Sequence, residues 1–380
     1  MAFTVVPTPL WTVYEQRDGF NTLMVTVAFA IYAVGVLVSL FLAGHISDWL
    51  GRRTILLPAI LIEALSAVLF IFWNDLPGIL VARVISGFGI GMITATATAH
   101  ISELHSRAHP DRRGSRAQIV STAANIGGFA VGVLLSSLLV QFAAAPIVTP
   151  YAVFLGLLLL AAIGMVFVPE TVERPARLPR YHPQRIKIPE SARGEYFSAA
   201  GLAFAGLAVL GLFTAIAPVF VAGELHITSH LVGGLVVFAT FASAAGLQIG
   251  VGRLSRRTAI LIGVVLYILG FASIVVGVEL VSLALFIVGG VLAGGAAGIL
   301  FSSAIGAGGS LARAKERGEA LAGIFLAGYI GLAVPVVGIG AATLAISLPI
   351  AIIGFSILVV AIAVIAATIF LKRTASSRRA

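Results

Sequence analysis

The sequence of 380 residues contains no cysteine and few charged residues. Without cysteine there is no disulfide, no thiolate metal ligand and no cysteine nucleophile. Charged residues make up 10% and hydrophobic residues 59% of the chain, whereas soluble domains have about 25% and about 45–50%. This composition excludes an ordinary soluble enzyme, and it excludes a disordered chain, which needs the opposite balance.

Most of the chain consists of long apolar runs. Eleven of them have close to the length of about 20 residues that a bilayer requires, and they lie at 22–43, 54–73, 78–100, 117–142, 150–168, 197–221, 230–250, 258–278, 280–303, 319–342 and 349–371. Backbone polar groups in lipid must be hydrogen-bonded within their own segment, so each run is predicted to be a helix. The predicted fold class is an all-α polytopic protein of the lipid bilayer.

The first residues differ from these runs. Residues 1–11 are apolar but would extend only about 16 Å as a helix, roughly half of the hydrocarbon core. Pro7 and Pro9 argue against a secretory signal. We expect this segment to be the outer end of a twelfth helix whose beginning is absent. Either the start of the sequence is misplaced, or the protein is a natural variant with eleven full helices.

Lysine and arginine are confined almost entirely to alternate breaks between the runs. The breaks after the first, third, fifth, seventh, ninth and eleventh runs hold 22 of these 24 residues. The positive-inside rule places those breaks in the cytoplasm, so the central stretch and the C-terminus are expected there, in a plasma (inner) membrane protein. The net charge of +9 therefore requires no nucleic-acid partner.

The two halves of the chain can be superposed with a shift of 204 residues. The shift aligns Arg52-Arg53-Thr54 with Arg256-Arg257-Thr258, Arg113-Gly114 with Arg317-Gly318, and Ile126-Gly127 with Ile330-Gly331. Internal symmetry of this kind is common in transporters. We therefore predict two pseudo-symmetric six-helix bundles around a central cavity, at 1–168 and 197–380, joined by a basic cytoplasmic linker at 169–196.

One loop and two further segments carry a family signature. The break after the first run contains Gly44, Asp48, Gly51, Arg52 and Arg53 in the pattern G-x-x-x-D-x-x-G-R-R. Arg83 precedes Gly87, Gly89 and Gly91, and Pro169-Glu170-Thr171 ends the fifth run. Together these motifs resemble the major facilitator superfamily. An acid beside two arginines at a helix boundary can pair with a base or a helix N-terminus, and the resemblance implies that Asp48 helps to latch the two halves on the cytoplasmic side.

Two features depart from the family pattern. The equivalent loop of the second half, Gly252 to Arg257, lacks the aspartate, so the latch is expected to be one-sided. Val133 stands where drug–proton antiporters of this superfamily often have a proline, which weakens an antiporter assignment.

Charged groups inside the runs are candidates for function, because charge is costly at membrane depth. Arg83 could bind an anionic solute, pair with an acid, hold the site during a protonation cycle or extend to the outer interface. Glu63 could carry a coupling proton or make a structural pair. The uncharged candidates for a polar and aromatic cavity lining are Asn125, Tyr329, Gln248 and Tyr32. Their alternative role is packing between helices. Gly87, Gly89 and Gly91 are expected to allow close helix contact. His100, His105 and His109 are expected on the cytoplasmic surface.

The function predicted from these features is secondary active transport of a small organic solute, with proton-coupled efflux as the preferred form. The chain has no nucleotide-binding G-x-x-x-x-G-K-[ST] motif, and we expect no cofactor, no metal and no enzymatic activity. An uptake symporter of the same superfamily remains an alternative, as does a transport-inactive membrane protein that binds or regulates a partner. The protein is expected to be a monomer, and the solute, the direction and the coupling ion are left open.

Overall fold

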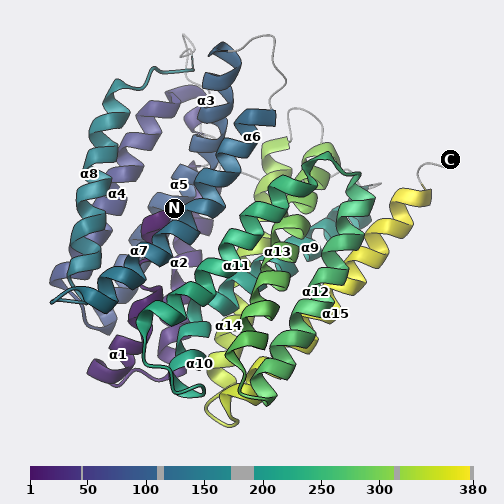
Figure 1. Ribbon diagram of the computed structural model, residues 1–380. Coiled ribbons are helices and arrows are strands. Elements are labelled where there is room, and N and C mark those ends of the chain that lie inside the picture. The colour runs from purple at the N-terminus through teal and green to yellow at the C-terminus, as the bar shows by residue number, and fades with distance from the viewer. Residues whose placement is uncertain (44–45, 109–114, 173–191, 312–316, 377–380) are drawn as a thin grey trace. The chain divides into compact units, whose positions relative to one another are not determined.

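The computed structural model describes residues 1–43, 46–108, 115–172, 192–311 and 317–376, and these ranges contain helices and no strands (Figure 1). Eleven segments within them are helical, long and apolar enough to cross a membrane. This confirms the predicted all-α polytopic fold class.

The candidate spans follow the chain in order. They are α2 (Thr22–Ala43), α4 (Arg52–Phe72), α5 (Leu76–Ala108), the composite of α6 (Ser115–Thr122), η3 (Ala123–Gly127) and α7 (Gly128–Phe142), α8 (Thr149–Phe167), α9 (Arg193–Ala215), α11 (His230–Gly250), α12 (Arg256–Glu279), α13 (Leu283–Leu311), α14 (Arg317–Ala342) and α15 (Leu348–Ser376). The shorter elements are η1 (Ala2–Val5), η2 (Thr8–Leu10), α1 (Trp11–Asp18), α3 (Ser47–Leu50), α10 (Ala217–Gly223) and η5 (Val251–Arg253).

The chain divides into two compact units. Unit 1 comprises residues 1–10 and 31–185, and unit 2 comprises residues 11–30 and 186–380. In unit 1, α4 packs against both α5 and α8. In unit 2, α13 packs against α9, α11 and α12, and α9 also packs against α14 and α15. The division falls inside α2, so both units contain part of that helix.

Residues 1–10 do not form a regular α-helix, although the sequence analysis expected them to be the outer end of one. They form the two 3-10 turns η1 and η2. Proline has no backbone N–H and its ring obstructs the preceding turn, so Pro7 and Pro9 prevent an uninterrupted α-helix here. The side chains of Phe3, Val5 and Leu10 are nevertheless buried, and the segment is part of the core of unit 1.

Proline also divides the apolar run at 197–221, which was expected to be one helix. α9 ends at Ala215, and α10 begins at Ala217 with Pro218 in its first turn. Proline is well tolerated in the first turn of a helix, where no N–H is required, but not further along it. A new helix therefore begins at this point.

Candidate functional site

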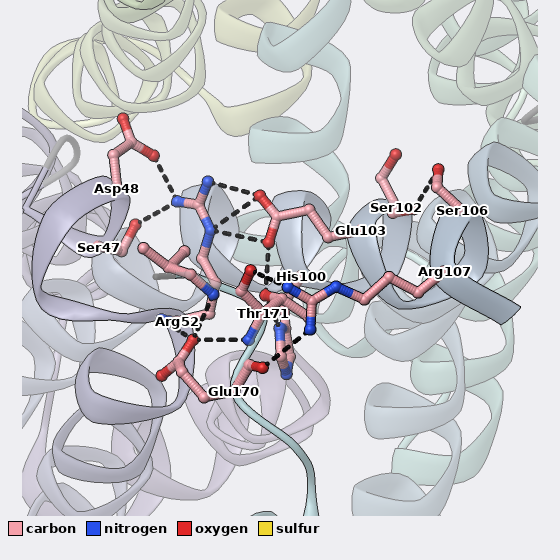
Figure 2. Close-up of polar contacts among 11 residues, drawn as sticks. Ser47, Asp48, Arg52, His100, Ser102, Glu103, Ser106, Arg107, Glu170 and Thr171 are labelled. Carbon is pink, nitrogen blue, oxygen red and sulfur yellow. Dashed lines mark hydrogen bonds and ion pairs between the residues drawn. The ribbon is translucent and has the colours of Figure 1, made fainter. Parts of the chain in front are cut away.

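The guanidinium of Arg52 connects three helices of unit 1, α3, α4 and α5 (Figure 2). Arg52 is the first residue of α4 and is 8% exposed. It forms ion pairs with Asp48 of α3 and with Glu103 of α5, the latter at 2.8 Å, and it donates a hydrogen bond of 2.7 Å to Ser47. Charge-assisted bonds of this kind are about twice as strong as neutral ones, so Arg52 links α3, α4 and α5 strongly.

Glu170, which follows α8, caps the N-terminus of α4. Its two carboxylate oxygens accept hydrogen bonds from the backbone N–H groups of Arg52 at 2.8 Å and Arg53 at 3.1 Å. The first N–H groups of a helix lack partners within the helix, and their partial positive charge favours an anion. Gly51 leaves room for this cap: its φ is +110°, and a Cβ there would collide with Glu170.

The environment of Glu170 holds its pKa below the usual value for a glutamate. Partial burial acts in the opposite direction, but four backbone N–H groups stabilise the ionised form, those of Val172, Arg52, Thr171 and Arg53. Glu170 is therefore a charged cap at neutral pH.

Three side chains of the last turns of α5 hold the segment after α8. His100 Nδ1 lies 2.9 Å from the hydroxyl of Thr171, which in turn donates to Glu103 at 2.5 Å. Arg107 donates to the backbone carbonyls of Glu170 at 3.1 Å and Thr171 at 2.6 Å. His100 is 3% exposed, so the expectation of a surface position was wrong for this residue. His109 lies outside the described residues.

We call this cluster the Arg52 network, and its members are Asp48, Arg52, His100, Glu103, Arg107, Glu170 and Thr171. The motif in the sequence identified Asp48, Gly51 and Arg52, whereas Arg53 contributes its backbone N–H. Gly44 lies outside the described residues. Of the three α5 residues, His100 was expected on the surface, and Glu103 and Arg107 lie beyond residue 100, where the predicted helix ended. Their spacing of three and four residues, which places side chains on one helix face, was the available signal.

The equivalent loop of unit 2 is organised differently. Ser255 caps α12 by accepting a hydrogen bond of 3.2 Å from the backbone N–H of Thr258. Arg256 donates to the carbonyl of Gly306 at 3.0 Å and to the hydroxyl of Ser310 at 3.3 Å, both in α13. In this loop the helix cap is the adjacent Ser255, where α4 has the distant Glu170. The arginine bonds neutral acceptors, where Arg52 bonds two carboxylates.

A second polar group lies inside the helices of unit 1. Glu63 of α4 is 1% exposed, and it accepts a hydrogen bond of 2.9 Å from Ser86 of α5. Gly89 makes room for the carboxyl group, because a Cβ at this position would lie 2.6 Å from Glu63 Oε1. Glu63 therefore lies directly at the contact between α4 and α5.

Arg83 lies on α5 one helical turn before Gly87 and is 2% exposed. Its guanidinium donates to the carbonyl of Thr4 at 2.8 Å and is centred 4.7 Å above the ring of Tyr32. The charges of Arg83 and Glu63 also interact electrostatically. The structure thus brings the candidates Glu63, Arg83 and Tyr32 together in unit 1.

Pro7 and Pro9 explain which backbone carbonyls of residues 1–10 need a hydrogen-bond donor from a side chain. We call residues 1–10 the first segment. In a 3-10 turn the N–H of a residue bonds the carbonyl three positions earlier. Pro7 and Pro9 have no N–H, so the carbonyls of Thr4 and Val6 lose that donor. Arg83 supplies a donor to Thr4, and Ser136 of α7 supplies one to Val6 at 2.7 Å.

The glycines of α5 face two different helices. A Cβ at Gly87 would collide with the backbone of Tyr32, and one at Gly91 would lie 2.8 Å from the carbonyl of Val36, both in α2. Gly89 faces α4, where the nearest backbone atom is the carbonyl of Ala59 at 3.1 Å. The absence of side chains allows α2 and α4 to approach α5 closely.

The remaining candidates are distributed over both units. Asn125 lies in the π-helical turn η3 of unit 1, is half-buried, and donates to the carbonyl of Ser121 at 2.9 Å. Single π-helical turns are frequent at functional sites. Tyr329 of α14 is buried and Gln248 of α11 is half-buried, and both belong to unit 2.

Unit 2 also contains a cavity of about 360 Å³ beside α1 and α10. Its polar lining includes Thr12, Glu15, Gln16, Thr22 and Glu224. Glu15 lies on α1, outside the candidate membrane spans. Burial raises the pKa of Glu15 to about 7.

This raised pKa predicts a pH-dependent effect of Glu15→Gln on stability. The folded protein favours the protonated carboxyl, so its stability falls as the pH rises from about 4.5, the ordinary value, to about 7 and then levels off. Glutamine removes this loss. We expect the melting temperature of the variant to match the parent near pH 4.5 and to exceed it at pH 8. Glu279→Gln, at an exposed carboxylate of α12, is the control, and a difference independent of pH would contradict the prediction.

The fold and these polar groups define a multi-pass helical membrane protein with charged side chains buried between its helices. The chain belongs to the Major Facilitator Superfamily, whose sequence profile matches residues 1–335. It is 25% identical over 289 residues to the chloramphenicol resistance protein CraA of Acinetobacter baumannii, which covers 71% of this chain and 65% of the relative. It is also 38% identical over 82 residues to an arabinose-proton symporter of Bacillus subtilis, covering 22% and 17% of the two chains. These matches span less than two thirds of either relative.

Solved structures show the same fold. The nucleoside transporter NupG superposes with a TM-score of 0.69 at 11% identity, over 98% of this chain and 96% of the other. The human organic anion transporter MFSD10 superposes with a TM-score of 0.68 at 16% identity, over 97% and 95%.

Proposed function

We propose that this chain is a secondary active transporter that moves a small organic solute across the plasma membrane by alternating access. Bundles at 1–168 and 197–380, joined by the basic linker at 169–196, would rock around a central cavity, as in other transporters built from repeats. The single observation that carries the proposal is the Arg52 network. It joins Asp48, Arg52 and the backbone of Arg53, three residues of the family motif, in polar contacts that water can replace.

The Arg52 network is suited to act as a latch on one side of the membrane. The side chain of Asp48 is 60% exposed although it pairs with Arg52, so it can accept a further partner from outside unit 1. The positive-inside pattern supports a cytoplasmic position for the network, the linker and the C-terminus. The latch would be closed when the transporter is open to the outside.

Glu63 is the proposed carrier of the coupling proton. It is a carboxyl group inside a candidate span, it is almost completely buried, and it has a hydroxyl partner in Ser86 and an electrostatic partner in Arg83. Ionisable groups in such positions mark proton and substrate pathways. Asn125, Tyr329, Gln248 and Tyr32 are proposed to contact the solute.

We favour efflux as the direction of transport. The match to a chloramphenicol resistance protein extends over 289 residues and supports this direction. The second candidate is a proton-coupled uptake symporter, supported by the shorter but closer match to an arabinose-proton symporter. A membrane protein that binds or regulates a partner without transport is the third.

Reconstituted protein tests the proposal. Purified protein is first screened for solutes that raise its melting temperature, because only ligands of the native state do so. Stabilising solutes and a hydrophobic dye are then offered to proteoliposomes with an imposed pH gradient of either sign. Efflux predicts that solute leaves the cytoplasmic face as protons enter, and uptake predicts movement of both in the same direction. Absence of any gradient-driven flux would contradict transport.

Glu63→Gln tests the proton carrier. Glutamine preserves the volume and the contact with Ser86 but cannot exchange a proton, so gradient-driven accumulation is expected to disappear while exchange of solute across the membrane continues. Glu279→Gln removes an exposed carboxylate and is expected to accumulate solute as the parent does. Accumulation by the Glu63 variant at the parental level would exclude Glu63 from coupling.

A further inference from the structure

The buried imidazole of His100 has an unusual position at the end of the Arg52 network. Its Nδ1 atom is 2.9 Å from Thr171 Oγ1. Its Nε2 atom is buried and has no hydrogen-bond partner among the described residues. The family motif does not include His100, and the proposed transport mechanism has not used it.

The ion pair at the other end determines the direction of the hydrogen bonds. Glu103 faces the guanidinium of Arg52 at 2.8 Å and is therefore an acceptor. Thr171 has one hydroxyl proton and donates it to Glu103 Oε2 at 2.5 Å. The oxygen of Thr171 must then accept from His100, so the proton of the imidazole lies on Nδ1.

These contacts form one directed chain from the imidazole to Arg52. His100 donates to Thr171, Thr171 donates to Glu103, and Glu103 accepts from Arg52. A threonine hydroxyl can rotate freely about its bond to carbon. Without a donor on its oxygen, it could turn away from Glu103 and bond a water molecule instead.

We propose that His100 is a positioning residue of the Arg52 network: its Nδ1–H orients the Thr171 hydroxyl toward Glu103 and thereby holds the segment after α8 against α5. The proposal rests on the latch function assigned to the network above. Its significance comes from the place of Thr171 in the chain. Thr171 lies near the start of the basic segment 169–196 that joins the proposed bundles, so His100 fixes the beginning of that segment against α5.

Thiol labelling beside Thr171 tests the proposal without requiring transport. The chain has no cysteine, so Val172→Cys gives a single, half-buried reactive site. In this background His100→Leu is expected to raise the rate of reaction with a water-soluble maleimide about fivefold, the change expected for one neutral hydrogen bond. His100→Asn keeps an N–H donor close to the position of Nδ1 and is expected to retain the parental rate.

Two further variants separate positioning from loss of packing. Thr171→Val removes the same hydroxyl and is expected to raise labelling as His100→Leu does, and the double variant should be no faster than either single one, because both remove one shared interaction. Thr171→Ser retains the hydroxyl and is expected to react with the maleimide at the parental rate. Ser106→Ala, which removes a hydroxyl that donates to the carbonyl of Ser102 in the same helix, is the control.

The two proposals can fail separately. An unchanged labelling rate in His100→Leu, or a rate in His100→Asn as high as in His100→Leu, would overturn the positioning role. The predicted labelling pattern in a protein that shows no solute flux would leave His100 as a positioning residue and contradict the transport function.

Discussion

Arg52→Met is expected to cause the largest loss of stability and transport among substitutions in the Arg52 network. Methionine preserves much of the apolar volume but leaves the carboxylates of Asp48 and Glu103 without their cation. Removing one partner of a buried ion pair costs about 3–5 kcal/mol. Asp48 is 60% and Glu103 33% exposed, so solvent reduces the penalty, and we expect about 2–3 kcal/mol.

Arg53→Met is the matched control for this substitution. Arg53 is adjacent, has the same charge, and contributes to the network through its backbone N–H, which the substitution retains. Arg53 is half-buried and its side chain is not a member of the network, so we expect a change within about 0.5 kcal/mol. Melting temperature in detergent and solute flux in proteoliposomes are measured for both variants. Equal effects of Arg52→Met and Arg53→Met would show that net charge, and not the network, determines the behaviour.

Local signals in the sequence predicted the membrane spans and part of the network. Apolar runs and the length of a bilayer suffice to locate the spans. The end of α5 was placed too early because its last two turns contain Glu103 and Arg107. Charged residues end a membrane span in a hydropathy profile, but they need not end a helix, whose backbone bonds continue into water.

The contacts of Glu170 could not be predicted in the same way. It caps α4 from 118 positions further along the chain, and no periodicity relates two such positions. The positive φ of Gly51 and the free N–H groups of Arg52 and Arg53 indicate that some cap is needed, but only the tertiary packing of α8 against α4 identifies it. The contact of His100 with Thr171 likewise joins two residues that no local pattern of the sequence relates.

For residues 1–10 the sequence predicts the break in the helix but not the groups that stabilise it. Pro7 and Pro9 indicate a break in the helix, and the sequence contains both. Which groups would satisfy the freed carbonyls depends on α5 and α7, which supply Arg83 and Ser136. From the sequence Arg83 was a candidate for binding an anionic solute, pairing with an acid or holding the site during a protonation cycle, and the structure adds a hydrogen bond to the backbone of Thr4.

Arg83→Met is expected to release the first segment from unit 1. The substitution removes the hydrogen bond to Thr4, which involves a charged donor and is worth about 1.5–3 kcal/mol, and the cation–π contact with Tyr32, worth up to about 2 kcal/mol when desolvated. We expect a loss of about 2–4 kcal/mol and faster hydrogen exchange of the amides in residues 1–10, measured by mass spectrometry.

Two neighbouring serines of α7 provide the comparison that identifies the cause. Ser136→Ala removes the donor to Val6 and is expected to accelerate exchange in the same residues, at a cost of about 1 kcal/mol for a neutral bond. Ser137→Ala is the control, because Ser137 is equally buried but donates to the carbonyl of Val133 in its own helix. If Arg83 stabilises residues 1–10 by bonding a carbonyl that the prolines leave without a donor, Arg83→Met and Ser136→Ala will accelerate exchange of the same amides. Ser137→Ala will not. If Arg83→Met abolishes flux while exchange in residues 1–10 stays at the parental rate, Arg83 acts on the solute or the proton, and its contact with Thr4 is incidental.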